Sequence, residues 1–483
     1  MKVVGSTLLA AALLWVFDPA ATARADTLLT PADKASDALA HEIYRQLIEI
    51  NTTDTPAGNV TTAAQAMQKR FQEAGFPAAD IALMGATDRT RNLVVRLHGS
   101  GEHRPVLLIG HLDVVEARRE DWSTDPFKLI EKDGFFYGRG SLDMKSPDAI
   151  MVATLLRMKQ ERFVPKRDII LALTANEEGG CCNGVAWLLN NERRLIDAQF
   201  VVNQDEASVL TDHGKPQYLR LIATEKVYAD YQLTVTNKGG HSSLPVPDNA
   251  IYTLSRGLSR LAAHEFPFEL NNVTRAYFEH TARIETGQRA ADMRAIVRNP
   301  PDPAAIARLS RDVDDSPLMR TTCVATRLAG GHANNALPQR AEAIVNCRIL
   351  PGHSPEQIRQ VLIKVLAEPA ITVGWLSAEG KLSEKAPDQG GFAPAPLLPE
   401  LMAPLEQVVG QLWPKLEVIP SMSAGASDAV YTSAAGLPTY TFSGLSVERD
   451  GDRSHGRDER LGVASFYQGN EFFYRFLKLL TER

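Results

Sequence analysis

The sequence has little cysteine, no excess of positive charge and no long hydrophobic run beyond its first residues. Four cysteines among 483 residues cannot form the dense set of disulfides that stabilises small secreted domains. A formal net charge of −6, without a long basic stretch, argues against a nucleic-acid-binding surface. The 44% of hydrophobic residues is typical of a globular protein, and the length favours two domains or one elaborated domain.

The one hydrophobic run lies at the N-terminus. Lys2 precedes an almost wholly apolar segment, and Ala23-Arg24-Ala25 has the small residues that signal peptidases accept. The apolar segment has about 15 residues, fewer than the roughly 20 that cross a bilayer. We therefore expect residues 1–25 to be a cleaved signal peptide. The mature protein would be secreted across the inner membrane without a stable membrane anchor, and would be periplasmic in a Gram-negative cell and extracellular otherwise.

Hydrophobic patterns predict an α/β fold with an interruption. Apolar runs typical of buried strands lie at 92–97, 105–110, 168–175 and 198–203. The segment 145–160, between two of these runs, has helical spacing of its apolar residues. From Thr224 the predicted order becomes β-α-β-β-α-β, which is typical of a ferredoxin-like domain. We expect a larger domain with a mostly parallel central sheet, formed by 26–223 and 386–483. A smaller α+β lid domain, 224–385, would interrupt it and contain an insertion near 266–317.

Histidine and acidic residues follow the predicted strands. His111-Leu-Asp113 comes directly after an apolar strand, and residues two apart in an extended chain face the same side. Asp113 can therefore accept a hydrogen bond from the His111 ring while the other ring nitrogen binds a metal. A lone pattern of this kind is more typical of a loop histidine. Asp143 lies in a glycine-rich turn before a predicted helix, where helix capping is the alternative role.

Further ligand candidates lie at other strand ends. The adjacent Glu177 and Glu178 follow a buried strand, where they repel each other unless a cation lies beside them. Asp205 follows the next strand, and sites in open α/β sheets lie beyond the carboxyl ends of strands. Together the motifs predict a two-metal site with the ligands His111, Asp143, Glu178, Asp205 and His455. Nitrogen and oxygen ligands without thiolate suit zinc, and also cobalt or manganese.

In their order, these motifs resemble the M20 family of dinuclear zinc peptidases, which includes carboxypeptidases, dipeptidases and aminoacylases. The resemblance extends over about residues 35–480. It implies that the larger domain is catalytic and that the five ligands hold two Zn²⁺ ions, with Asp143 bridging them. It also implies that Asp113 orients His111 and that Glu177 is the general base. Glu206 is the alternative to Asp205 as a ligand.

The resemblance also implies residues that bind substrate. His241, in Gly-Gly-His-Ser-Ser, would help to hold the oxyanion, and Asn335 would contact the substrate. Arg348 would receive a substrate carboxylate, because a guanidinium group pairs with it bidentately; a surface salt bridge is the alternative. Gly425 and Ser427 would belong to a loop beside the substrate.

The sequence thus predicts an exported metal-dependent hydrolase. It would cleave an amide or peptide bond of a small substrate with a free α-carboxylate, as dipeptidases and carboxypeptidases do. The alternatives are an N-acyl amino acid deacylase with the same site and a non-catalytic binding protein. A homodimer formed through the lid domain is a further expectation, whereas a nucleic-acid partner is not expected.

The four cysteines fall into two pairs. Cys181 and Cys182 are adjacent, and a disulfide between neighbours would be strained, so we expect none. Cys323 and Cys347 lie on predicted neighbouring strands of the lid domain, where a disulfide and two free thiols are both compatible with the sequence.

Overall fold

The computed structural model describes residues 30–377, 380–388, 391–448 and 451–483. The predicted signal peptide therefore lies outside the described residues. Among the helices of the described ranges, none combines the length and hydrophobicity that crossing a membrane requires.

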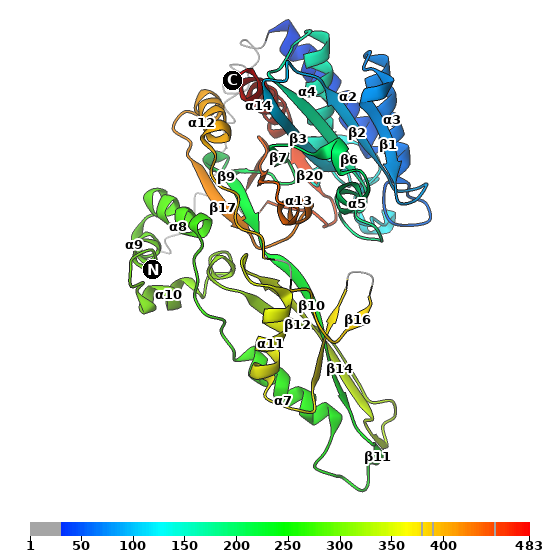
Figure 1. The fold of residues 1–483 in the computed structure, drawn as a ribbon, viewed down its shortest axis with the longest axis vertical. Coiled ribbons are helices and arrows are strands. Elements are labelled where there is room, and N and C mark those ends of the chain that lie inside the picture. The colour runs from blue at the N-terminus through cyan, green and yellow to red at the C-terminus, as the bar shows by residue number, and fades with distance from the viewer. Residues whose placement is uncertain (1–29, 378–379, 389–390, 449–450) are drawn as a thin grey trace, which may run out of the picture.

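The larger part of the molecule is built on a ten-stranded mixed sheet (Figure 1). Its strands are β1 (Ile81–Gly85), β2 (Arg91–Leu97), β3 (His103–His111), β6 (Arg167–Thr174), β7 (Phe200–Asn203), β8 (Val209–Asp212), β9 (Lys215–Glu225), β17 (Val418–Ser423), β18 (Thr439–Thr441) and β19 (Ser446–Glu448). The spatial order is β1-β2-β6-β3-β7-β18-β9-β8-β19, with β17 paired to β9. The centre, β6-β3-β7-β18, is parallel. The predicted α/β class with a largely parallel central sheet is confirmed.

Helices cover both faces of this sheet. They are α2 (Pro31–Ile48), α3 (Val60–Glu73), α4 (Lys145–Gln160), α5 (Gly184–Asn191), α6 (Arg193–Ile196), α12 (Pro399–Leu412), α13 (Ala429–Ala434) and α14 (Val463–Glu482). Alternate strand residues serve opposite faces: in β3, Val106 and Leu108 join the core under α2, α4 and α14, whereas Leu107 and Ile109 join the core beside α5 and α6. Because both faces are buried, the central strands consist of continuous apolar runs.

A three-stranded sheet lies beside α14. It consists of β4 (Ile130–Lys132), β5 (Phe135–Tyr137) and β20 (Arg460–Gly462), in the order β20-β5-β4. Phe136 of β5 packs edge-on against Phe466 of α14, with ring centroids 5.8 Å apart. This sheet therefore brings the segment before α4 next to the segment before α14, which are remote in the sequence.

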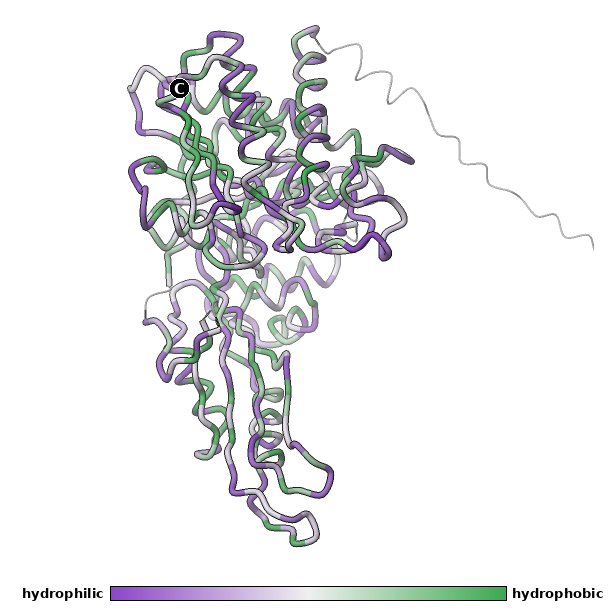
Figure 2. The backbone as a smooth tube through the Cα atoms, turned by 90° about the vertical axis from the view of Figure 1, so that its right-hand side faces the viewer, coloured by the Kyte–Doolittle hydropathy of each residue, from purple (hydrophilic) through white to green (hydrophobic). Residues whose placement is uncertain are grey.

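A second, antiparallel sheet extends away from the first as a narrow projection (Figures 1 and 2). Its strands, in spatial order, are β12 (Thr322–Gly330), β14 (Arg340–Ile349), β10 (Val227–Thr236), β15 (Thr372–Leu376) and β16 (Leu382–Ser383). The helices α7 (Ala250–Ala262) and α11 (Pro355–Leu366) share a hydrophobic core with it. The chain order is therefore β-α-β-β-α-β, with β16 added at one edge. We refer to this projection as the lid.

The far tip of the lid is a two-stranded ribbon of β11 (Gly240–His241) and β13 (Ala336–Leu337) (Figure 1). At the other end of the lid, Cys323 of β12 faces Cys347 of β14 and forms a disulfide with it. Cys181 and Cys182, which both lie in the described part of the chain, form no disulfide. The disulfide that the sequence left open is therefore present, and the strained neighbouring pair is not.

The insertion within the lid segment packs mainly against the larger domain. It forms α8 (Asn272–Ile284), α9 (Gly287–Ile296) and α10 (Pro303–Leu309). Phe278 of α8 is fully buried in a core with Tyr218 of β9 and with Ile419 and Met422 of β17. These helices cover apolar side chains of β9 and β17, so the insertion supports the edge of the central sheet rather than the lid sheet.

Candidate metal and catalytic site

The strand order β6-β3-β7 brings three predicted ligand segments together. His111 ends β3 and is 1% exposed, while Glu177 and Glu178 follow β6 and Asp205 follows β7. Nε2 of His111 lies 3.1 Å from Oδ1 of Asp143 and 3.5 Å from Oδ1 of Asp205. One histidine nitrogen is thus surrounded by two carboxylates from separate segments.

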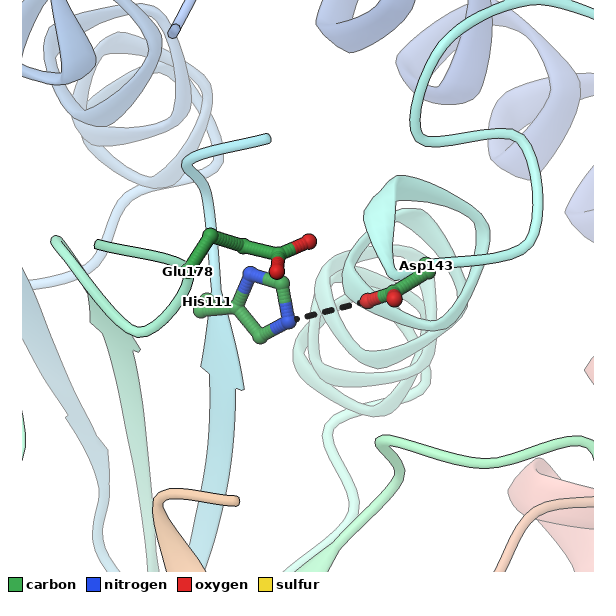
Figure 3. A group of neighbouring side chains, drawn as sticks. All are labelled: His111, Asp143 and Glu178. Carbon is green, nitrogen blue, oxygen red and sulfur yellow. Dashed lines mark hydrogen bonds and ion pairs between the residues drawn. The ribbon is translucent and has the colours of Figure 1, made fainter. Parts of the chain in front are cut away.

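Asp143 lies between two histidines. Its Oδ1 faces His111, and its Oδ2 lies 3.1 Å from Nε2 of His455. The same His455 nitrogen lies 2.8 Å from Oε2 of Glu178. Figure 3 shows His111, Asp143 and Glu178 directed toward a common point, and they form a group with potential ligand atoms within 4.8 Å of one another. Each histidine therefore faces one oxygen of Asp143 and one further carboxylate, as two neighbouring cation positions would require.

Asp113 touches His111, but not with the atom that the sequence suggested. Nδ1 of His111 lies 3.0 Å from the main-chain oxygen of Asp113 and 3.8 Å from its Oδ1. The carboxylate instead accepts hydrogen bonds from the amides of Glu177, at 3.2 Å, and Glu178, at 3.0 Å. The prediction of a carboxylate–imidazole hydrogen bond is wrong, because the main-chain oxygen of Asp113 lies beside Nδ1 and the carboxylate lies farther away. The Asp113 carboxylate holds the adjacent loop instead.

A cleft of about 350 Å³ opens over these groups and is strongly acidic. Among the residues that the structure describes, seven carboxylates line it, against one arginine and one histidine. Hydrogen bonds to Asp143 and Glu178 raise the pKa of His455 to about 10, so the surrounding carboxylates favour positive charge there. Burial raises the pKa of Glu177 well above its usual range, and the neighbouring Asp205 acts in the same direction. Nitrogen and oxygen donors in an excess of negative charge fit a divalent cation.

The competing assignments of Asp205 and Glu206 have different surroundings. Asp205 faces His111, whereas Glu206 forms an ion pair with Arg220 of β9. Asp205 therefore has the position of a ligand, and the carboxylate of Glu206 is already engaged by a guanidinium group.

Gly425 and Ser427 line the cleft, as the sequence predicts for a loop beside the substrate. The structure adds Glu225, which sequence reasoning missed. The main-chain N–H and the hydroxyl of Ser427 each donate to the Glu225 carboxylate at 2.8 Å. Burial raises the pKa of Glu225 to about 7. Its place at the carboxyl end of β9 is the signal that could have found it.

The lid residues predicted to bind substrate lie away from the cleft. His241 and Asn335 are neighbours at the lid tip, where the amide of Ser242 donates to the main-chain oxygen of Asn335 at 3.0 Å. The tip is at the far end of the projection from the carboxylate cluster (Figure 1). Arg348 lies nearer the central sheet and stacks over Tyr228, with 4.7 Å from its guanidinium carbon to the ring centroid. None of the three lines the cleft within the described chain.

Comparisons with known proteins agree with this geometry. The model of peptidase family M20/M25/M40 matches residues 107–479. The mouse N-fatty-acyl-amino acid synthase/hydrolase PM20D1 is 26% identical over 391 residues, which cover 78% of this chain and 74% of that protein. A succinyl-diaminopimelate desuccinylase from Cereibacter sphaeroides is 28% identical over 419 residues, covering 85% of this chain and 92% of the relative.

A solved structure has the same fold. The M20 family metallo-carboxypeptidase Sso-CP2 from Sulfolobus solfataricus aligns over 92% of this chain and 99% of its own, with a TM-score of 0.68 and 16% identity.

The family match, which spans most of the sequence, shows that the chain belongs to peptidase family M20/M25/M40. It is a metal-dependent hydrolase.

The two amide hydrogen bonds that Asp113 accepts can be tested by substitution. In Asp113→Asn, only one side-chain oxygen remains as an acceptor, and the new NH₂ group faces a second N–H. We expect the Glu177–Glu178 loop to shift and the affinity for divalent metal to fall by about 10–100-fold, measured by titrating the metal-free protein against a chromophoric chelator. Asp88→Asn is the control, because that side chain is 91% exposed. Equal affinities in the two variants would contradict the role given to Asp113.

Proposed function

We propose that this hydrolase cleaves the amide bond of a small N-acyl amino acid with a free α-carboxylate, using two Zn²⁺ ions. The observation that carries the proposal is the position of Asp143, which offers one oxygen toward His111 and the other toward His455. Asp205 would complete the ligands beside His111, and Glu178 those beside His455.

The relatives favour N-acyl amino acids over dipeptides. An N-fatty-acyl-amino acid synthase/hydrolase and a succinyl-diaminopimelate desuccinylase, by their names, both act on acylated amino compounds, and each matches across most of its length. The dipeptidase or carboxypeptidase activity favoured by the sequence motifs is the second candidate. It is supported by a probable carboxypeptidase S-like relative from Dictyostelium discoideum that is 27% identical over 386 residues.

In the proposed reaction, bound divalent cations would polarise the amide carbonyl and lower the pKa of a water molecule. Glu177 takes a proton from that water on its carboxylate as the water oxygen bonds to the carbonyl carbon. Glu177 then gives the proton to the leaving nitrogen as the C–N bond breaks, which yields a carboxylic acid and an amine. Asp113 holds the amide of Glu177 and so fixes the loop that carries this base. Arg348 would pair with the α-carboxylate of the substrate.

We further propose that the lid tip of one copy completes the site of a second copy. His241 and Asn335 lie too far along the projection to serve the cleft of their own chain without a large movement (Figure 1). In the described part of the lid, β12 is an edge strand that pairs with β14 on one side only. Its Val324 and Leu328 are 60% and 69% exposed, and an exposed apolar edge strand favours pairing with another chain. A symmetric dimer joined through β12 is the arrangement we expect.

Export is the remaining part of the proposal. It rests on the N-terminal signal-peptide pattern of residues 1–25. The disulfide between Cys323 and Cys347 supports it, since such bonds persist in oxidising compartments.

Substrate choice is tested with a set of N-acyl amino acids, dipeptides and the matching N-acyl amino acid amides. We expect the first set to give the highest kcat/KM, and the amides to bind less well because Arg348 has no carboxylate to pair with.

The role of Glu177 is tested by substitution. Glu177→Gln should retain two metal ions while kcat falls about 10²–10⁴-fold, because the base is lost. Bound metal with no hydrolysis of any compound would instead support the binding-protein alternative.

Complementation between two variants tests whether His241 of one copy serves the site of the other copy. Glu177→Gln and His241→Ala should each be inactive as pure proteins, but co-expression forms mixed dimers. In a mixed dimer, the intact Glu177 site meets the intact His241 of its neighbour, so about a quarter of wild-type activity should return if half of the dimers are mixed. Activity no higher than that of the separate variants would show that His241 serves its own chain, for example by lid closure.

The export proposal is tested on protein recovered from the periplasm or medium. The mature chain should begin at or near Asp26. Without reductant, denatured protein should show two titratable thiols, and after reduction all four cysteines should react. A mature protein that retains Met1 inside the cell would overturn the proposal.

A further inference from the structure

A buried ion pair joins the two segments that carry Asp143 and His455. Nη1 of Arg139 lies 2.7 Å from Oε2 of Glu459, and both side chains are almost fully buried, at 3% and 0% exposed. The two residues are far apart in the sequence and meet where β5 pairs with β20. Neither binds a predicted metal position itself, so the pair is additional to the site described above.

The Glu459 carboxylate is saturated by the turn that leads to Asp143. Besides Arg139, it accepts main-chain N–H groups of Gly140 at 3.0 Å, Leu142 at 2.8 Å and Asp143 at 3.1 Å. Each carboxylate oxygen therefore accepts two hydrogen bonds. One of these bonds fixes the backbone of the residue whose side chain lies between the two histidines.

The other arm of Arg139 holds the His455 loop. Nη2 donates to the main-chain oxygens of His455 at 3.3 Å and Gly456 at 3.1 Å. His455 has a φ of 62°, in the left-handed region that non-glycine residues occupy only when their surroundings hold them there. The ring of Trp122, 5.1 Å from the guanidinium carbon, packs against Arg139. The guanidinium group therefore links a carboxylate on one side to a constrained turn on the other.

We propose that Arg139 and Glu459 are positioning residues that set the spacing between Asp143 and His455 and thereby the affinity of the cation position that these two ligands share with Glu178. This inference rests on the proposed two-metal function. Arg139 bonds the His455 turn directly and reaches Asp143 only through Glu459, whereas Glu459 accepts the Asp143 amide itself. Loss of the guanidinium fork should therefore weaken one cation position, and loss of the carboxylate should weaken both.

The test is calorimetric titration of the metal-free mature protein with Zn²⁺, with His455→Ala used to identify which binding step depends on His455. Lysine at position 139 keeps the charge but cannot reach Glu459 and both carbonyl oxygens together. In Arg139→Lys, the step assigned to His455 should weaken by about 10–100-fold while the other changes little. In Glu459→Gln, both steps should weaken, because an amide cannot accept four hydrogen bonds.

Arg157→Lys is the matched control for the loss of a part-buried guanidinium group that bonds two partners. Arg157 pairs with Asp33 at 2.9 Å and Glu161 at 2.8 Å and is 11% exposed. It lies about 18 Å along α4 from the helix start beside Asp143. This variant should lower the melting temperature and leave both Zn²⁺ affinities unchanged. A purely structural role for Arg139 would make the two lysine variants behave alike.

The outcomes separate the inference from the function on which it rests. Wild-type protein that binds no divalent metal would overturn the proposed function. Two wild-type steps that Arg139→Lys leaves unchanged, or weakens equally, would overturn the positioning role. Should Arg139→Lys not fold, hydrogen exchange of the wild-type protein decides instead: slow exchange of the Leu142 and Asp143 amides is expected, and fast exchange would overturn the inference.

Discussion

Carboxylates crowd together where β3, β6 and β7 end, and their mutual repulsion is the constraint on which the site depends. His111 and His455 each lie between acidic groups from different segments, and no other basic side chain besides Arg220 lines the described cleft. Such an arrangement is stable only with cations, protons or dense hydrogen bonding. Hydrogen bonds engage three nearby carboxylates that are not candidate ligands: Asp113 accepts two amides, Glu225 accepts Ser427 twice, and Glu459 accepts four donors.

This division separates two kinds of buried acid. The carboxylates of Asp113, Glu225 and Glu459 accept hydrogen bonds from main-chain N–H groups, so they hold loops in place. Asp143 and Glu178 direct theirs toward histidine nitrogens and the cleft, so they remain available to a cation. A carboxylate therefore holds a loop where main-chain N–H groups lie beside it, and is available as a metal ligand where they do not.

Much of the architecture and the candidate ligands could be predicted from the sequence, because both depend on local patterns. Continuous apolar runs identified the parallel strands, acids after those runs identified Glu178 and Asp205, and a glycine-rich turn before a predicted helix identified Asp143. The atom by which Asp113 meets His111 could not be predicted, since it depends on the exact path of the backbone after β3. Arg139 and Glu459 were missed because their pairing arises only when β5 and β20 come together. The lid motifs predicted substrate roles for His241 and Asn335, but a local pattern contains nothing about their distance from the cleft.

The insertion α8–α10 lies beside the junction between the cleft and the lid. β9 ends at Glu225, and only Lys226 separates it from β10 of the lid. The Lys226 ammonium group is buried and donates at 2.7 Å to the main-chain oxygen of Arg320, whose own side chain bonds Ser310 just after α10. Burial lowers the pKa of Lys226 to about 7. The junction that a moving lid would have to bend is therefore tied to the same helices that support β17. Bending the lid toward its own cleft would have to break these contacts, which is a physical reason behind the proposal that a second copy uses the lid tip.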